Sequence, residues 1–141
     1  AHDIDDTWSA TFHLNLADAP LGFTITQIDT HAGWSVANIE QSYEVLYSTV
    51  GDSEFTSLGF FSFFPTYTGF LHSTLIEITG TSGTIVTNVN AIRFDFLGQV
   101  PLGSAMREID VFGYATVPEP SSAAFLLLSC MGFWQRRRRS R

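Results

Sequence analysis

The 141-residue sequence predicts an all-β protein, folded as an antiparallel β-sandwich or jelly roll. Aromatic and β-branched residues dominate residues 8–113, and helical periodicity is hard to find there. Short apolar stretches in this region are separated by Gly, Pro and Asn, the residues that favour turns. About eight short strands with no helical insert indicate an antiparallel architecture.

The first predicted strand covers residues 8–16, where apolar and polar residues alternate without a break. Its apolar positions are Trp8, Ala10, Phe12, Leu14 and Leu16. This period of two is typical of a half-buried strand. Residues 17–20, which read Ala-Asp-Ala-Pro, end it with turn residues, and the alternation resumes over residues 23–28.

A hairpin follows, with strands at residues 43–47 and 55–61 joined by Gly51-Asp52-Ser53. Four more strands are expected at residues 74–79, 84–87, 91–97 and 108–114. The turns between them fall at Gly80, Gly83, Asn88, Asn90 and Pro101-Leu102-Gly103.

The Phe-rich segment, residues 60–65, fits the alternation poorly. One interpretation is an exposed aromatic loop for ligand stacking or assembly. We favour a strand that is buried on both faces and ends at Pro65.

The charge is divided along the chain. Residues 1–117 hold thirteen carboxylates and two cations, a net charge of −11, whereas residues 118–141 hold one carboxylate and five arginines, a net charge of +4. An acidic body with two cations cannot neutralise a row of phosphates, so the charge argues against nucleic-acid binding. The single cysteine, Cys130, lies near the C-terminus, which leaves the body without thiols for disulfides, nucleophilic catalysis or thiolate metal sites.

Several motifs resemble, in order, those of discoidin-like modules, also called factor 5/8 C-type or galactose-binding-like domains. They are Asp5-Asp6-Thr7-Trp8, residues 27–34 (QIDTHAGW), residues 41–48 (QSYEVLYS), residues 91–96 (AIRFDF) and residues 107–113 (REIDVFG). The resemblance implies that residues 1–116 form a jelly roll that binds ligands, commonly carbohydrate, through loops at one end. Family members usually have a strand or more before the acidic loop, so we expect an N-terminally incomplete domain.

The same resemblance implies a structural calcium ion. Related modules hold it between the early acidic loop and a glutamate at the start of the last strand. The corresponding residues are Asp3, Asp5, Asp6, Thr7 and Glu108. Calcium takes six to eight oxygen ligands, which closely spaced acids can supply. The family's usual glycine after the first Asp is absent, and the alternative is a solvated acidic loop.

His31 and Trp34 lie in a glycine-containing loop where an aromatic face could stack on a sugar ring. We favour the alternative, in which Trp34 closes the end of the sandwich and His31 is merely exposed. No histidine pair has metal-ligand spacing, and the chain has no GxSxG, HExxH or phosphate-loop motif. We therefore predict that the protein is not an enzyme and that Arg93, Asp95 and Arg107 form structural ion pairs.

Residues 117–141 read VPEPSSAAFLLLSCMGFWQRRRRSR. The uncharged run at residues 123–134 would form a helix about 18 Å long, too short for a bilayer core of about 30 Å. Three features follow in order: Pro118-Glu119-Pro120, the apolar run, and Arg136, Arg137, Arg138 and Arg139. Arginines that flank a membrane-inserted segment stay on its cytoplasmic side. The arginines from Arg136 to Arg139 would therefore place the body of the protein on the other side of the membrane.

This order resembles the PEP-CTERM sorting signal of Gram-negative bacteria that produce exopolysaccharide. The resemblance implies transient insertion in the inner membrane and cleavage near Pro118-Glu119-Pro120 by an exosortase, a membrane transpeptidase. The alternative is a plain C-terminal membrane anchor.

The sequence therefore predicts an exported protein of the cell surface or extracellular matrix whose body binds carbohydrate of the exopolysaccharide. Two alternatives stay open: a purely structural envelope protein without a small ligand, and an accessory module of a larger carbohydrate-active enzyme.

Overall fold

The computed structural model describes residues 8–33, 38–66, 73–96 and 105–117. All regular secondary structure in these ranges is β-strand, which confirms the predicted all-β class. The seven strands of the described ranges are β1 (Trp8–His13), β2 (Phe23–Ala32), β3 (Gln41–Thr49), β4 (Thr56–Phe63), β5 (Thr74–Thr79), β6 (Val86–Phe96) and β7 (Met106–Ala115).

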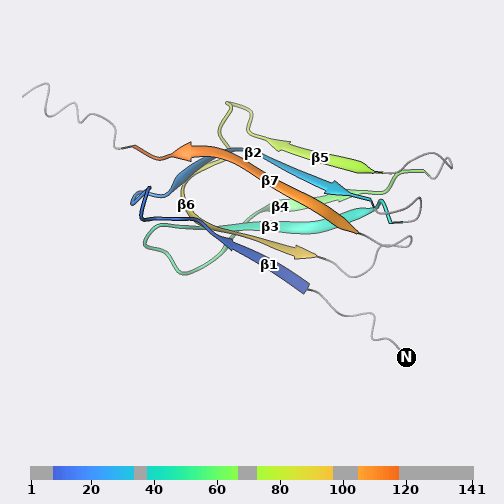
Figure 1. The fold of residues 1–141 in the computed structure, drawn as a ribbon, viewed down its shortest axis with the longest axis horizontal. Coiled ribbons are helices and arrows are strands. Elements are labelled where there is room, and N and C mark those ends of the chain that lie inside the picture. The colour runs from blue at the N-terminus through green and yellow to red at the C-terminus, as the bar shows by residue number, and fades with distance from the viewer. Residues whose placement is uncertain (1–7, 34–37, 67–72, 97–104, 118–141) are drawn as a thin grey trace, which may run out of the picture.

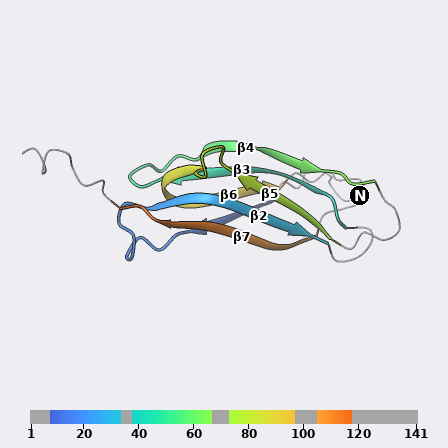
Figure 2. The ribbon, with the colours of Figure 1, turned by 90° about the horizontal axis from the view of Figure 1, so that it is seen from above.

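The strands form one antiparallel sheet that curls on itself (Figure 1). Its order is β4-β3-β6-β2-β5, with β1 added to β6 and β7 added to β2. Strands β2 and β6 meet only near their starts, at Phe23↔Val89 and Ile25↔Val86. We call β1, β6, β3 and β4 the β3 half, and β7, β2 and β5 the β2 half. Seen from above, β3 and β4 lie along one side and β2 and β7 along the other, as in a sandwich (Figure 2).

The core lies between the two halves and is built from inward side chains of β2, β3, β5 and β6, with partly buried side chains of the other strands packed against them. Its buried members are Ile25, Ile28, Tyr43, Val45, Ile78, Val89, Ile92, Phe94 and Phe96. The Tyr43 ring centroid lies 5.8 Å from that of Phe94 and 6.0 Å from that of Phe96. Aromatic side chains bury the largest apolar areas, so this cluster supplies much of the driving force for folding.

Strand β6 replaces two predicted strands. We expected Asn88 and Asn90 to form a turn, but the strand continues through both. Asn88 has a φ of 60°, in the left-handed region that Asn tolerates better than most residues. The irregularity bends β6 where it leaves β2 and begins to pair with β1, so the asparagine redirects the strand without ending it.

Strand β1 ends at His13, three residues before the predicted end at Leu16. Strands β5 and β7 and the β3–β4 hairpin lie where we expected them. The predicted C-terminal helix and the sorting residues fall in residues 118–141, outside the described ranges. Within the described ranges, no helix is long and apolar enough to cross a membrane.

The favoured interpretation of the Phe-rich segment is wrong. The segment forms the end of β4, but this strand pairs only with β3 among the described residues and so lies at an edge. Phe61 packs against the core, whereas Phe60, Phe63 and Phe64 are exposed. An edge strand covered on one face cannot bury all its rings.

Candidate functional site

One end of the sheet gathers the residues that the sequence singled out. Strands β2, β4 and β6 end there, and β1, β3, β5 and β7 begin there (Figure 1). Strands β2 and β6 reach the same end because β6 turns after its short antiparallel contact with β2 and then pairs with β1 and β3. We call this the loop end (Figure 1, where the arrowhead of β2 lies). His31 and Glu108 lie on strands at this end. Trp34 follows β2 in the sequence and Thr7 precedes β1, but Trp34, Asp3, Asp5, Asp6 and Thr7 lie outside the described residues.

His31 of β2 and Glu108 of β7 are cross-strand neighbours. Ile28, Thr30 and Ala32 are buried, so alternation places His31 on the outer face of the β2 half. Exposed Leu75 of β5 is the partner of His31 on its other side. The structure therefore joins one residue of the predicted sugar site to one of the predicted calcium site. An imidazole, a carboxylate and an apolar side chain in one row can hydrogen-bond a hydroxyl-rich ligand and cover an apolar patch of it.

Of the five predicted calcium ligands, Glu108 is the one that lies in the described residues. Its exposed carboxylate is a suitable oxygen donor for calcium. In the described part of the chain, no three His, Cys, Asp or Glu side chains are close enough to hold a metal ion. The other four predicted ligands lie outside that part, so the site stays a prediction.

A row of carboxylates crosses the outer face of the β2 half next to His31. Asp29 of β2 lies between Glu77 of β5 and Asp110 of β7. Gln27 Nε2 donates to both carboxylate oxygens of Asp29, at 2.9 and 3.0 Å. Among the described residues these carboxylates have no ion pair with a cation. The face is therefore negative, which disfavours anionic polymers as ligands.

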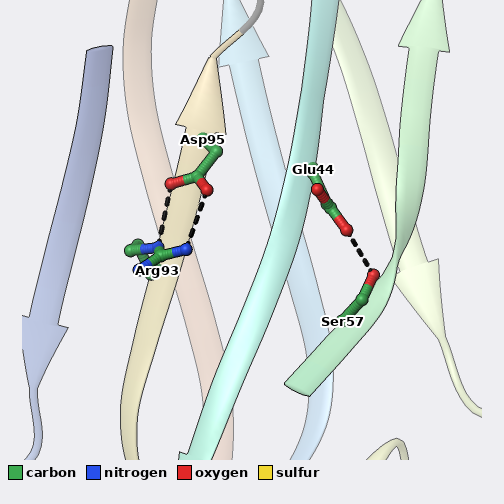
Figure 3. Close-up of polar contacts among 4 residues, drawn as sticks. All are labelled: Glu44, Ser57, Arg93 and Asp95. Carbon is green, nitrogen blue, oxygen red and sulfur yellow. Dashed lines mark hydrogen bonds and ion pairs between the residues drawn. The ribbon is translucent and has the colours of Figure 1, made fainter. Parts of the chain in front are cut away.

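The outer face of the β3 half holds polar groups that pair with each other (Figure 3). Arg93 Nη2 donates to Asp95 Oδ2 at 2.9 Å, and Nε lies 2.9 Å from Oδ1. The guanidinium also lies 4.7 Å from the Phe55 ring centroid. This confirms the predicted Arg93–Asp95 ion pair. Arg107 has no ion pair with any described residue.

A buried polar network lies between the halves near the loop end. Thr30 Oγ1 donates to Gln41 Oε1 at 2.8 Å and lies 2.5 Å from the Tyr43 hydroxyl. Gln41 Nε2 donates to Thr74 Oγ1 at 3.0 Å, and Thr74 Oγ1 donates to the Ile39 carbonyl at 2.6 Å. These bonds tie β2, β3 and β5 together beneath the loops. Burial raises the pKa of Tyr43, and its hydrogen bond with Thr30 offsets part of the rise.

Sequence reasoning missed both the network and the carboxylate row. The available signal for the network was Thr30, a polar residue at an inward position of an apolar alternation. The signal for the row was Gln27, Asp29 and His31, three polar residues two apart on one strand.

Comparison with known protein families, with curated proteins and with solved structures finds no match to this chain. The resemblances to discoidin-like modules and to the PEP-CTERM signal therefore rest on the sequence motifs themselves.

Proposed function

We propose that this chain is an exported, non-catalytic protein of the outer surface or extracellular matrix of a Gram-negative bacterium, sorted by an exosortase. The observation that carries the proposal is the order of three features at residues 118–139. Pro118-Glu119-Pro120 comes first, then the uncharged run, then the arginines from Arg136 to Arg139. The two prolines favour an extended backbone, the form in which proteases bind substrates.

The direction of β7 supports this arrangement. Strand β7 begins at the loop end and runs ten residues, about 33 Å at about 3.3 Å per residue, to Ala115. The chain then continues toward the sorting motif from the opposite end of the sheet. A body held by its C-terminal tail would therefore present the loop end away from the membrane.

The loop end is the proposed carbohydrate site, on a jelly roll of the discoidin-like kind. His31 and Glu108 would hydrogen-bond sugar hydroxyls, and Trp34 would stack on the apolar face of a pyranose ring. The neighbouring row of Asp29, Glu77 and Asp110 favours a neutral polysaccharide over an anionic one. The buried network beneath supplies a rigid base, which reduces the entropy lost on binding.

Sorting is tested by the intact mass of the protein isolated from its native host. Cleavage near residue 118 removes the arginines, and the mass falls accordingly. A mass that still includes Arg136–Arg139 would contradict exosortase processing and support a plain anchor.

Carbohydrate binding is tested separately on a glycan array with the full chain. Glu108→Gln keeps the shape of the side chain but removes its charge, so we expect weaker binding of neutral glycans. Glu54→Gln is the matched control, because the exposed Glu54 lies between β3 and β4 at the opposite end of the sheet, and binding should be retained.

The second candidate function is purely structural, without a small ligand. The exposed Phe residues in and directly after β4 favour it, because an apolar surface on an edge strand of the described sheet also suits contact with another protein. Absence of binding to any glycan would support this candidate.

A further inference from the structure

Among the described residues, β4 is paired along one edge only, and three exposed rings lie in it or directly after it. Phe60, Phe63 and Phe64 are 55, 44 and 51% exposed, and none of them has a ring contact with another described residue. Residues 56–66 carry no charge. We propose that β4 pairs with β4 of a second copy of this chain, antiparallel, so that the sheet continues from one molecule into the next.

The backbone of β4 determines which kind of segment can pair with it. Among the described residues, β4 pairs only with β3. Every second residue of β4 therefore directs its backbone N–H and C=O groups away from β3, where no described strand binds them. An extended strand satisfies such a row of groups. Residues 58–64 (LGFFSFF) contain no charge and no proline, the composition typical of segments that associate through strands.

The other edges of the sheet are less suited to pairing. Strand β7 carries Arg107, Glu108 and Asp110, and β5 carries Glu77, and charges oppose edge-to-edge association. Strand β1 is uncharged but shorter, and its rings contact aromatic residues of their own molecule. The Trp8 ring stacks on Phe96 at 3.9 Å, and Phe12 packs edge-on against Phe94 at 6.0 Å.

Charge also indicates how two copies approach. Residues 1–117 carry −11, so copies repel each other wherever acidic surfaces meet. Glu44 is the partner of Phe60 on β3, and three strand spacings, about 14 Å, separate the Glu44 residues of two copies paired through β4. This exceeds the Debye length of about 8 Å at physiological salt, so their repulsion is screened.

Glu54 selects the antiparallel direction. It lies two residues before β4, so parallel pairing would place the Glu54 carboxylates of two copies side by side. Antiparallel pairing about Phe60 places each of them beside Thr66 of the other copy, which is uncharged.

The contact area predicts a modest affinity. The exposed parts of the three rings amount to about 300 Å² per copy if a Phe side chain covers about 200 Å². Two copies therefore bury at most about 600 Å² of ring surface, below the roughly 1,600 Å² of a standard interface. We expect a micromolar dissociation constant and a monomer at high dilution.

Sedimentation velocity of the full chain from about 1 to about 500 µM tests the proposal, a range that brackets micromolar affinity. Phe60→Lys and Ser62→Lys each place a charge on the face of β4 that points away from the core. Each should weaken association of two copies at least tenfold. Phe112→Lys is the matched control, an exposed Phe on β7, and should leave association unchanged. All variants share the same C-terminal tail, so any association through the tail is common to all. A wild type that stays monomeric, or association unaffected by both β4 variants, would overturn the proposal.

Amide hydrogen exchange identifies the pairing directly. The outward N–H groups of β4 should become protected as the wild-type concentration rises, and should stay unprotected in Ser62→Lys at the same concentrations. Association without added protection in residues 56–63 would assign the contact to another surface and overturn β4 pairing.

Discussion

The hydroxyls of Thr30 and Tyr43 lie 2.5 Å apart in the buried space between the two halves of the sheet. Thr30 Oγ1 donates its hydrogen to Gln41 Oε1, so the Tyr43 hydroxyl must be the donor in the bond between Thr30 and Tyr43. Both side chains are fully buried. Tyr43 must therefore keep its proton for the network to be satisfied, which links the stability of the fold to the protonation of one phenol.

Tyr43→Phe should destabilise the protein by about 1–2 kcal/mol, because it removes a buried hydrogen bond and leaves Thr30 without that donor. Urea denaturation at neutral pH measures the change in the free energy of unfolding. Tyr114→Phe is the control, since that ring is 57% exposed, and should change the free energy by less than about 0.5 kcal/mol. Equal losses in the two variants would show that the Tyr43 hydroxyl contributes nothing.

Alkaline pH should destabilise the wild type more than Tyr43→Phe. Burial raises the pKa of Tyr43 above its ordinary value of 10.0. The neutral phenol therefore stabilises the fold fully below about pH 10, and this contribution is lost as the pH rises through the raised pKa. The free energies of unfolding of the wild type and of Tyr43→Phe should be measured from about pH 8 to pH 12. The difference between them should decrease as the pH rises. Parallel curves would contradict the role of Tyr43 in this titration.

Local pattern predicted much of the fold. The alternation at residues 8–16 and the Gly51-Asp52-Ser53 turn identified β1 and the β3–β4 hairpin, because period and turn chemistry act within a few residues. Local patterns do not predict pairing between strands that are distant in the sequence. Asn88 continues β6 because β2 and β1 pair successively with the same side of that strand, and those partners are distant in the sequence.

In the candidate site, too, contacts within one strand were predictable and contacts between distant strands were not. The Arg93–Asp95 pair was predictable, since residues two apart on a strand share a face. The His31–Glu108 pair depends on the register between β2 and β7, which only the folded sheet determines. The exposure of Phe60 and Phe63 likewise depends on the edge position of β4, and edge strands cannot be recognised from apolar content.

Asp95→Asn should cost about 1 kcal/mol, because it breaks the two-point contact with Arg93. The two side chains are 31 and 29% exposed, so solvent screens part of the interaction, and the loss should shrink in 1 M salt. Thermal denaturation at low and high salt measures this. Asp110→Asn is the control, because it removes a carboxylate that faces Asp29 without a cation, and should leave stability unchanged or slightly raised. A loss in Asp110→Asn as large as that in Asp95→Asn would contradict the assignment.

Gly113→Ala should destabilise the protein by about 2–3 kcal/mol. A Cβ at Gly113 of β7 would lie 2.2 Å from the Thr24 carbonyl oxygen of β2, and backbone atoms within a paired sheet cannot move aside as a flexible side chain can. Gly51→Ala is the matched control: Gly51 has a φ of +91°, but a Cβ there meets nothing within 4 Å, so the change should cost only backbone strain of about 1 kcal/mol. Chemical denaturation of both variants measures the difference. If Gly51→Ala costs as much as Gly113→Ala, the close approach of β2 and β7 at this position is not what requires glycine.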